Sequence, residues 1–145
     1  MQDMIGHHAQ ALVMAGMVPT RTRNTSLRLL AEKVDVSQRD EIATIERWLH
    51  ARGLPDSSGH HHELMPGMLT PAELDQLRSA RDSAFDRLFL TFMIRHHEGA
   101  LVMVSRLFAA PGSAQDPELA GFANDVNADQ QAEIRRMRAL LAQTP

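Results

Sequence analysis

Residues 4–14 read MIGHHAQALVM and residues 93–103 read MIRHHEGALVM, so eight of eleven positions are identical at an offset of 89. A weaker match pairs residues 38–49 with residues 130–141 at an offset of 92. Such internal repetition indicates that one structural plan occurs twice in the chain. We therefore expect an all-α protein, a four-helix bundle built from two similar helical hairpins.

Proline, glycine and capping residues predict where the helices begin and end. The first helix is expected to stop before Pro19, and the second to end at Gly53 as a C-terminal glycine cap. A short helix should begin at Thr70, where the sequence TPAE combines a capping box with a proline in the first turn. The four long helices are expected over residues 1–17, 24–52, 82–110 and 116–142.

Length and composition bound the function. The 145 residues include 8 His and 9 Met but no Cys, which excludes disulfides, thiolate zinc sites, iron–sulfur clusters and a cysteine nucleophile. A net charge of −3 with only 1 Trp, 5 Phe and no Tyr argues against nucleic-acid binding. No apolar stretch approaches the roughly 20 residues of a membrane span. We expect one domain over residues 1–145: a hairpin (1–53), a connecting loop (54–70), then a short helix and second hairpin (71–145).

Both histidines of each repeated pair are expected to face the bundle interior. Rotation by about 100° per residue places them beside the buried seam, with methionines one or two turns away on the same side. A buried imidazole without a partner costs about 1–3 kcal/mol, so each ring nitrogen needs a hydrogen bond or a metal ion. The inward candidates for metal ligation are His7, His8, His96, His97, Met4, Met14, Met93 and Met103.

Polar side chains near these histidines leave two interpretations open. Gln38 and Gln130 interrupt apolar seams, and their amides could orient imidazoles that ligate a metal. The same amides would also serve a metal-free hydrogen-bond network. Asp86 lies on the side of its helix that carries His97, as a carboxylate ligand or as the partner of an imidazole.

The connecting loop is also rich in metal-ligating residues. Residues 60–68 read HHHELMPGM, a composition that indicates metal binding or, alternatively, a solvated polar loop. Folded over one end of the bundle, the loop would add His60, His61, His62, Met65 and Met68 to a site there.

The donor types favour a soft metal. Imidazole and thioether groups suit Cu(I), Cu(II) or Ag(I), whereas calcium and magnesium require clusters of oxygen ligands. Few inward carboxylates are apparent, and the Glu-x-x-His motif of ferritin-like di-iron sites is absent. Zinc held by histidine alone remains an alternative.

Several motifs together resemble the family called domain of unknown function 305. They are the two M-I-x-H-H segments, MPGMLT at 65–70, FDRLF at 85–89 and the Q…EI…WL pattern at 38–49, and they cover essentially the whole chain. The resemblance implies a ferritin-like bundle, periplasmic or secreted, with copper- or silver-binding members. It also implies ligands at the repeated His and Met positions and at Met65 and Met68, whereas the His60–His62 run goes beyond the family pattern. The first helix lacks a capping residue, and family members extend it, so we expect further residues upstream.

These observations predict a non-enzymatic copper-binding protein outside the cytoplasm, which sequesters or transports the ion for copper tolerance. Its expected partners are the metal ion and a copper-handling protein. One alternative is a metalloenzyme, either a copper oxidase or a hydrolase using a metal-bound water, with Asp86, Glu63 or a spare histidine as the base. Another is a metal-free interaction domain whose histidine network is structural.

Overall fold

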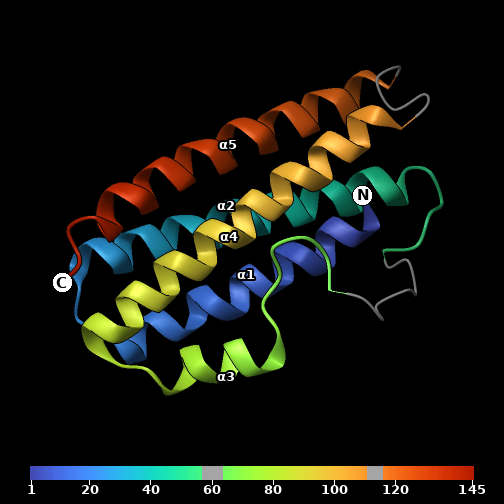
Figure 1. Cartoon of the computed structure of the whole chain (residues 1–145). Helices are drawn as coiled ribbons and strands as arrows, with labels where there is room; N and C mark the ends of the chain where they lie inside the picture. Colours follow the sequence, from blue (N-terminus) through green and yellow to red (C-terminus); the bar gives the residue numbers. More distant parts are fainter. Residues whose placement is uncertain (57–63, 111–115) are drawn as a thin grey trace.

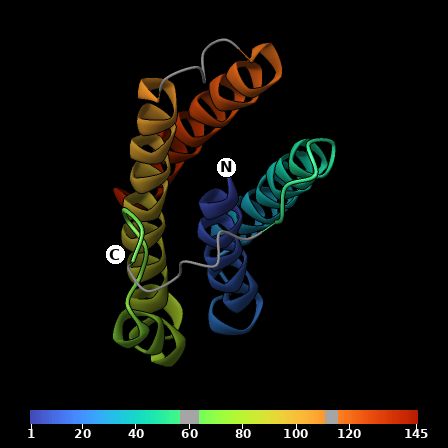
Figure 2. The same cartoon turned by 90° about the vertical axis from the view of Figure 1, so that its right-hand side faces the viewer.

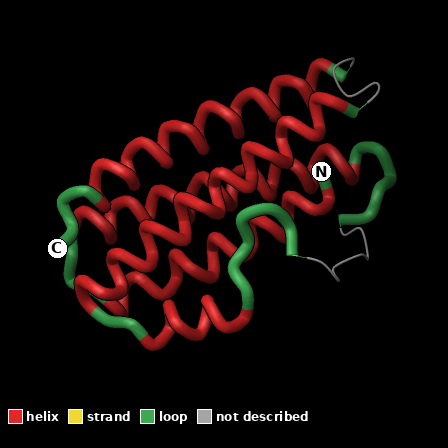
Figure 3. The backbone as a smooth tube through the Cα atoms, in the orientation of Figure 1, coloured by secondary structure: helices red, strands yellow, loops and turns green. Residues whose placement is uncertain are grey.

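The computed structural model describes residues 1–56, 64–110 and 116–145. In this part of the chain all regular structure is helical (Figure 3), as the repeat predicts. None of its helices has the length and apolar character that a membrane span needs. The helices are α1 (Gln2–Arg21), α2 (Thr25–His50), α3 (Pro71–Ser79), α4 (Asp82–Ala109) and α5 (Pro117–Leu141).

The four long helices form two hairpins. Helices α1 and α2 pack along each other, as do α4 and α5, and the hairpins meet mainly through α1 and α4 (Figure 1). Figure 2 shows the hairpins side by side, with the short helix α3 on the α4 side. The four-helix bundle of two similar hairpins is therefore confirmed.

Side-chain caps define most helix starts where the sequence predicts them. The Asn24 side chain accepts a hydrogen bond from the Leu27 amide at 3.2 Å, and Asp116 accepts from two amides of the first turn of α5 at 3.0 Å. At Thr70 the capping box is complete. Gly53 follows α2 with a φ of +65°, the left-handed conformation of a glycine that ends a helix.

The predicted end of the first helix at residue 17 is wrong, because α1 continues through Pro19 to Arg21. A proline lacks the amide hydrogen of one helical bond, but the last turn still closes through a bond from the Thr22 amide to the Val18 carbonyl at 3.3 Å. Val18 is fully buried, so packing against the core holds this turn in place.

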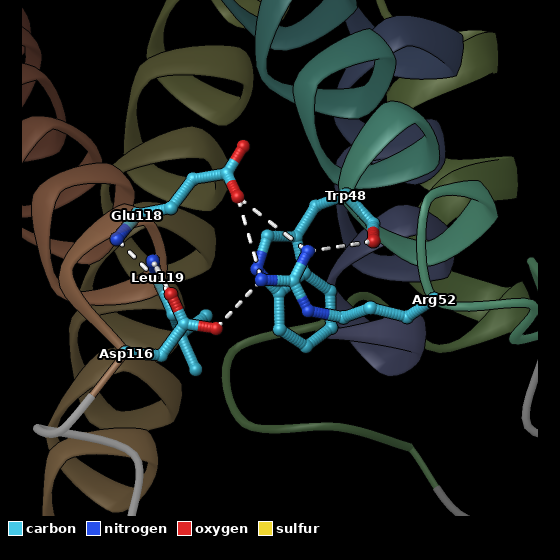
Figure 4. Close-up of polar contacts among 5 residues, drawn as sticks. All are labelled: Trp48, Arg52, Asp116, Glu118 and Leu119. Atoms are coloured by element: carbon cyan, nitrogen blue, oxygen red, sulfur yellow. Dashed lines mark hydrogen bonds and ion pairs between the residues drawn. The ribbon is translucent and has the colours of Figure 1, made fainter.

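An arginine joins the hairpins at one end (Figure 4). The Arg52 guanidinium, at the end of α2, donates to the Asp116 carboxylate at 2.8 Å and lies 4.1 Å from the Trp48 ring centroid. The same carboxylate caps α5, so one side chain both starts that helix and ties it to the other hairpin. The pair is partly exposed, and its contribution is about 1 kcal/mol or less.

A strap, residues 64–70, crosses α1 and α4 before α3 begins. Gln10 holds it with two hydrogen bonds to the Leu69 backbone, at 2.8 and 3.0 Å. On α4 the Pro66 carbonyl lies so close to Gly99 that a Cβ there would be 1.9 Å from its oxygen. Glycine at this position therefore lets the strap rest directly on the α4 backbone.

Gly99→Ala tests this contact. We expect it to lower the free energy of unfolding by about 1–3 kcal/mol, since a methyl group would collide with backbone rather than with a flexible side chain. The matched control is Gly16→Ala in α1, where an added Cβ meets nothing within 4 Å and should stabilise the helix by about 0.5–1 kcal/mol. Urea unfolding of both variants measures the difference, and equal stabilisation of the two would contradict the close approach.

Candidate metal centre

A polar layer crosses the bundle between two apolar clusters, and each long helix contributes two residues to it. Each of its side chains belongs to a residue that is at most 8% exposed. On every helix the layer separates residues of the larger cluster, which contains Phe85 and Phe89, from residues of the smaller one, which contains Ile45 and Val126. The layer consists of His7, His8, Gln38, Glu41, His96, His97, Gln130 and Glu133.

Two histidines of this polar layer pair with carboxylates of the neighbouring helix. His97 Nε2 lies 2.7 Å from Glu133 Oε2, and His8 Nε2 makes the equivalent contact with Glu41 Oε2. The Ser37 hydroxyl donates to the other Glu133 oxygen at 3.0 Å, which links α2 to α5. Each hairpin therefore contains one buried imidazole–carboxylate pair.

These two glutamates are absent from the predicted site residues, and the expectation of few inward carboxylates is wrong. The weaker repeat does contain the signal, because Glu41 and Glu133 occupy equivalent positions in it. Each follows Gln38 or Gln130 by three residues, close to one helical turn, so it faces the same seam. The carboxylates, rather than the two amides, bond the imidazoles of His8 and His97.

The other two histidines stack on each other. The ring centroids of His7 and His96 are 3.9 Å apart with an interplanar angle of 35°. His7 Nε2 donates to the Pro66 carbonyl of the strap at 2.9 Å, which leaves Nδ1 with its lone pair and no hydrogen-bond partner. His96 Nε2 is likewise buried without a partner. This part of the polar layer thus retains imidazole nitrogens that can bind a proton or a metal ion.

Burial keeps the imidazoles neutral. It lowers the pKa of His7 to about 4 against the opposing effect of its bond to Pro66, and lowers the pKa of His8 to about 3. Burial also holds the pKa of His96 well below its usual value, and the neighbouring imidazoles add to the shift. At neutral pH these side chains therefore carry lone pairs rather than charge.

Burial has the opposite effect on the carboxyl of Glu41. Its pKa rises to about 8, first through desolvation and then through the nearby Glu133 carboxylate. Burial therefore favours the uncharged form of both members of this contact, Glu41 and His8, near neutral pH.

A second feature, the thioether pocket, adjoins the polar layer. This cavity has a volume of about 270 Å³ and is lined by four methionines. One comes from α1, one from the strap, one from α4, and one is the residue before α1. Pro66, whose carbonyl bonds His7, forms part of its wall. Val104, Phe122 and Ala123 supply apolar surface, while Asp3 and Arg106 are charged residues of the lining. The four methionines are Met1, Met4, Met65 and Met103.

The structure divides the predicted ligands among several places. The four repeated histidines lie in the polar layer, whereas Met4, Met65 and Met103 line the thioether pocket together with Met1, which was not predicted. The remaining assignments are different: Met14 and Met93 lie fully buried in the larger apolar cluster, Met68 is partly exposed on the strap, and His60, His61 and His62 fall outside the described residues.

Asp86 does not act on an imidazole. Its Oδ2 accepts a hydrogen bond from the Asn24 side chain at 2.9 Å, near the start of α2. Across residues 1–56, 64–110 and 116–145, no three His, Asp or Glu side chains are arranged as they stand to hold a metal ion. Methionine sulfurs, by contrast, converge in the thioether pocket.

Comparison with known proteins gives the family. The family model described as a domain of unknown function, DUF305, matches residues 1–141. The chain belongs to the DUF305 family. The resemblance inferred from the repeated motifs is thereby confirmed, and no match is found among curated proteins.

Solved structures of DUF305 proteins have the same fold. A fragment from Deinococcus radiodurans is 33% identical, with a TM-score of 0.88 over 98% of this chain and 92% of that one. A protein from Streptomyces coelicolor, described as a candidate secreted DUF305 protein, is 30% identical, with a TM-score of 0.87 over 99% and 88%. CopM in its Cu(I)-bound form is 27% identical, with a TM-score of 0.78 over 98% and 92%, and CopM has also been solved in Cu(II)- and Ag-bound forms.

The pKa shifts predict a maximum of stability near pH 6.5. Below this pH the unfolded chain binds more protons than the folded one, through His7, His8 and His96, so the free energy of unfolding falls as pH falls. Above it the folded chain retains the proton on Glu41, whose pKa is about 8, while the unfolded chain has lost it. The titration of Glu41 alone therefore lowers stability by about 2 kcal/mol from pH 6.5 to pH 8, and deprotonation of the three histidines in the unfolded chain offsets part of this decline.

Glu41→Gln isolates the alkaline limb, since an amide resembles the protonated carboxyl but cannot titrate. We expect this variant to lose the decline above pH 6.5 and to keep the decline below it. Glu32→Gln, an exposed change on the same helix, should leave the whole profile unchanged. Urea unfolding measured across the pH range distinguishes the outcomes, and an alkaline decline that persists in Glu41→Gln would show that another group causes it.

Proposed function

We propose that this protein binds Cu(I) or Ag(I) in the thioether pocket, with Met4, Met65 and Met103 as sulfur ligands and Met1 as a further donor. The observation that carries the proposal is the convergence of these side chains, from separate segments of the chain, on one cavity of about 270 Å³. The neutral thioether is a soft donor that suits these ions and binds calcium, magnesium or sodium poorly. The absence of Cys leaves thioether as the sulfur chemistry of the chain.

His7 supports the pocket from the polar layer. Its bond to the Pro66 carbonyl fixes the strap residue next to Met65, and its Nδ1 has no hydrogen-bond partner. Because imidazole accepts both copper oxidation states, His7 and its stacking partner His96 are the histidines we propose as additional ligands. His8 and His97 already have carboxylate partners, and we assign them to maintaining the bundle.

The internal repeat shows why two of the other predicted methionines, Met14 and Met93, are not proposed as ligands. In the other copy of the repeat, Met93 corresponds to Met4 of the pocket, and Met14 corresponds to Met103. Phe85, Phe89 and other apolar side chains of the larger cluster surround Met14 and Met93. Met4 and Met103 line the thioether pocket, whereas Met14 and Met93 are fully buried.

The relatives support the same assignment. CopM, a protein of the same fold, has been solved with Cu(I), Cu(II) and Ag, and one DUF305 relative is described as a candidate secreted protein. We propose sequestration or transport of copper outside the cytoplasm, without catalysis. Of the bases considered for an enzyme, Asp86 accepts a hydrogen bond from Asn24, and Glu63 lies outside the described residues.

Competition with a Cu(I) chelator tests the ligand assignment. We expect Met4→Leu with Met103→Leu to weaken Cu(I) binding on the order of 100-fold, roughly tenfold for each thioether lost. Leucine keeps a similar apolar volume, so the fold should survive. Met65→Leu alone should weaken binding about tenfold.

The repeat offers a matched control. Met93→Leu with Met14→Leu changes the equivalent pair at the closed end, and it should leave Cu(I) affinity within about twofold of the original. Equal losses from both pairs would contradict the pocket assignment. Failure of the unaltered protein to compete with the chelator, or to gain thermal stability from Cu(I) or Ag(I), would contradict the proposed function itself.

A further inference from the structure

The methionines differ sharply in their access to solvent. Met14, Met93 and Met137 are fully buried, and Met4 is 5% exposed. By contrast, Met65 and Met103 are partly exposed at the thioether pocket. Since the rate of thioether oxidation follows exposure, the pocket separates reactive methionines from protected ones.

The thioether pocket is also large enough to admit an oxidant. Its volume of about 270 Å³ is several times the roughly 30 Å³ that a water molecule occupies in the liquid. Hydrogen peroxide is only slightly larger than water. It can therefore reach the sulfur atoms by the route that an ion would use.

We infer that Met65 and Met103 are oxidation sites and that peroxide, by converting them to sulfoxides, switches off ion binding in the pocket. This regulation rests on the proposed function. The sulfur lone pair attacks one peroxide oxygen, an S–O bond forms and the O–O bond breaks. The sulfur loses two electrons, and the second oxygen takes them with a proton and leaves as water.

The chemical consequence is a change of donor. Oxidation uses one of the two sulfur lone pairs, leaves the other on an electron-poor sulfur, and adds a polar, hard oxygen, which Cu(I) and Ag(I) bind poorly. Conversely, an ion bound to the same lone pair shields the sulfur from peroxide. Binding and oxidation should therefore exclude each other.

The experiment uses Ag(I), because peroxide changes the oxidation state of copper but not that of Ag(I). The protein carries Met17→Leu and Met68→Leu, which removes two partly exposed methionines that do not line the pocket. It is treated with limiting hydrogen peroxide, and sulfoxides are mapped by peptide mass spectrometry. Ag(I) affinity is measured before treatment, after it, and after repair with methionine sulfoxide reductase.

We expect Met65 and Met103 to oxidise on the order of tenfold faster than Met14 and Met93, with saturating Ag(I) slowing that oxidation several-fold. Oxidation should weaken Ag(I) binding about tenfold or more, and reductase should restore it. Thermal unfolding before and after treatment shows whether the fold is intact. The Met65→Leu variant is a second control, because it should unfold normally yet cannot be oxidised at that site.

The outcomes separate the two proposals. If the untreated protein binds Ag(I) but the oxidised protein binds it equally well, the oxidation switch is wrong and the proposed function stands. The switch is also wrong if the buried methionines oxidise as fast as those of the pocket, or if Ag(I) gives no protection. If the untreated protein does not bind Ag(I), both proposals are wrong.

Discussion

The burial of four imidazoles in the middle of a helical bundle is the constraint on which the rest of the structure depends. Each buried ring nitrogen left without a partner costs about 1–3 kcal/mol, comparable to a tenth or more of the stability of a small domain. Glu41 and Glu133 contact one ring nitrogen of His8 and of His97, and the Pro66 carbonyl accepts from one ring nitrogen of His7. These contacts join α1 to α2, α4 to α5, and α1 to the strap.

The strap explains why the two copies of the eleven-residue repeat differ where they do. Only three positions differ: Gly6 and Arg95, Ala9 and Glu98, and Gln10 and Gly99. Gln10 bonds the strap backbone, and Gly99 gives it room. Arg95 bonds Glu73 of α3 at 2.7 Å, so two of the three differences serve the strap and the helix that follows it.

Much of the fold could be predicted from the sequence, because it depends on local signals. Repetition gives the two hairpins, and capping residues such as Thr70 and Asp116 give helix starts. The end of α1 could not be predicted in this way, because the burial of Val18 outweighs the local effect of Pro19. Tertiary packing decided that boundary.

The site was predictable only in part, for a related reason. Helical periodicity brings the histidines inward, but it does not show which side chain of a neighbouring helix will meet them, as with Glu41 and His8. Periodicity likewise treats Met103 and Met14 as equivalents. Their surroundings differ because the strap lies beside Met103, whereas Phe85 and Phe89 belong to the apolar cluster that contains Met14. These contacts join segments that are far apart in sequence.

The difference between the surroundings of Met14 and Met103 means that the two ends of the bundle have different properties. The end that contains Met14 and Met93 is a closed core beside Phe85 and Phe89, whereas the end that contains Met4 and Met103 is open. Apolar substitutions at the closed end can therefore raise or lower the melting temperature without touching the open one. For protein engineering, the two ends of the bundle can therefore be changed separately, the closed end for stability and the open end for chemistry.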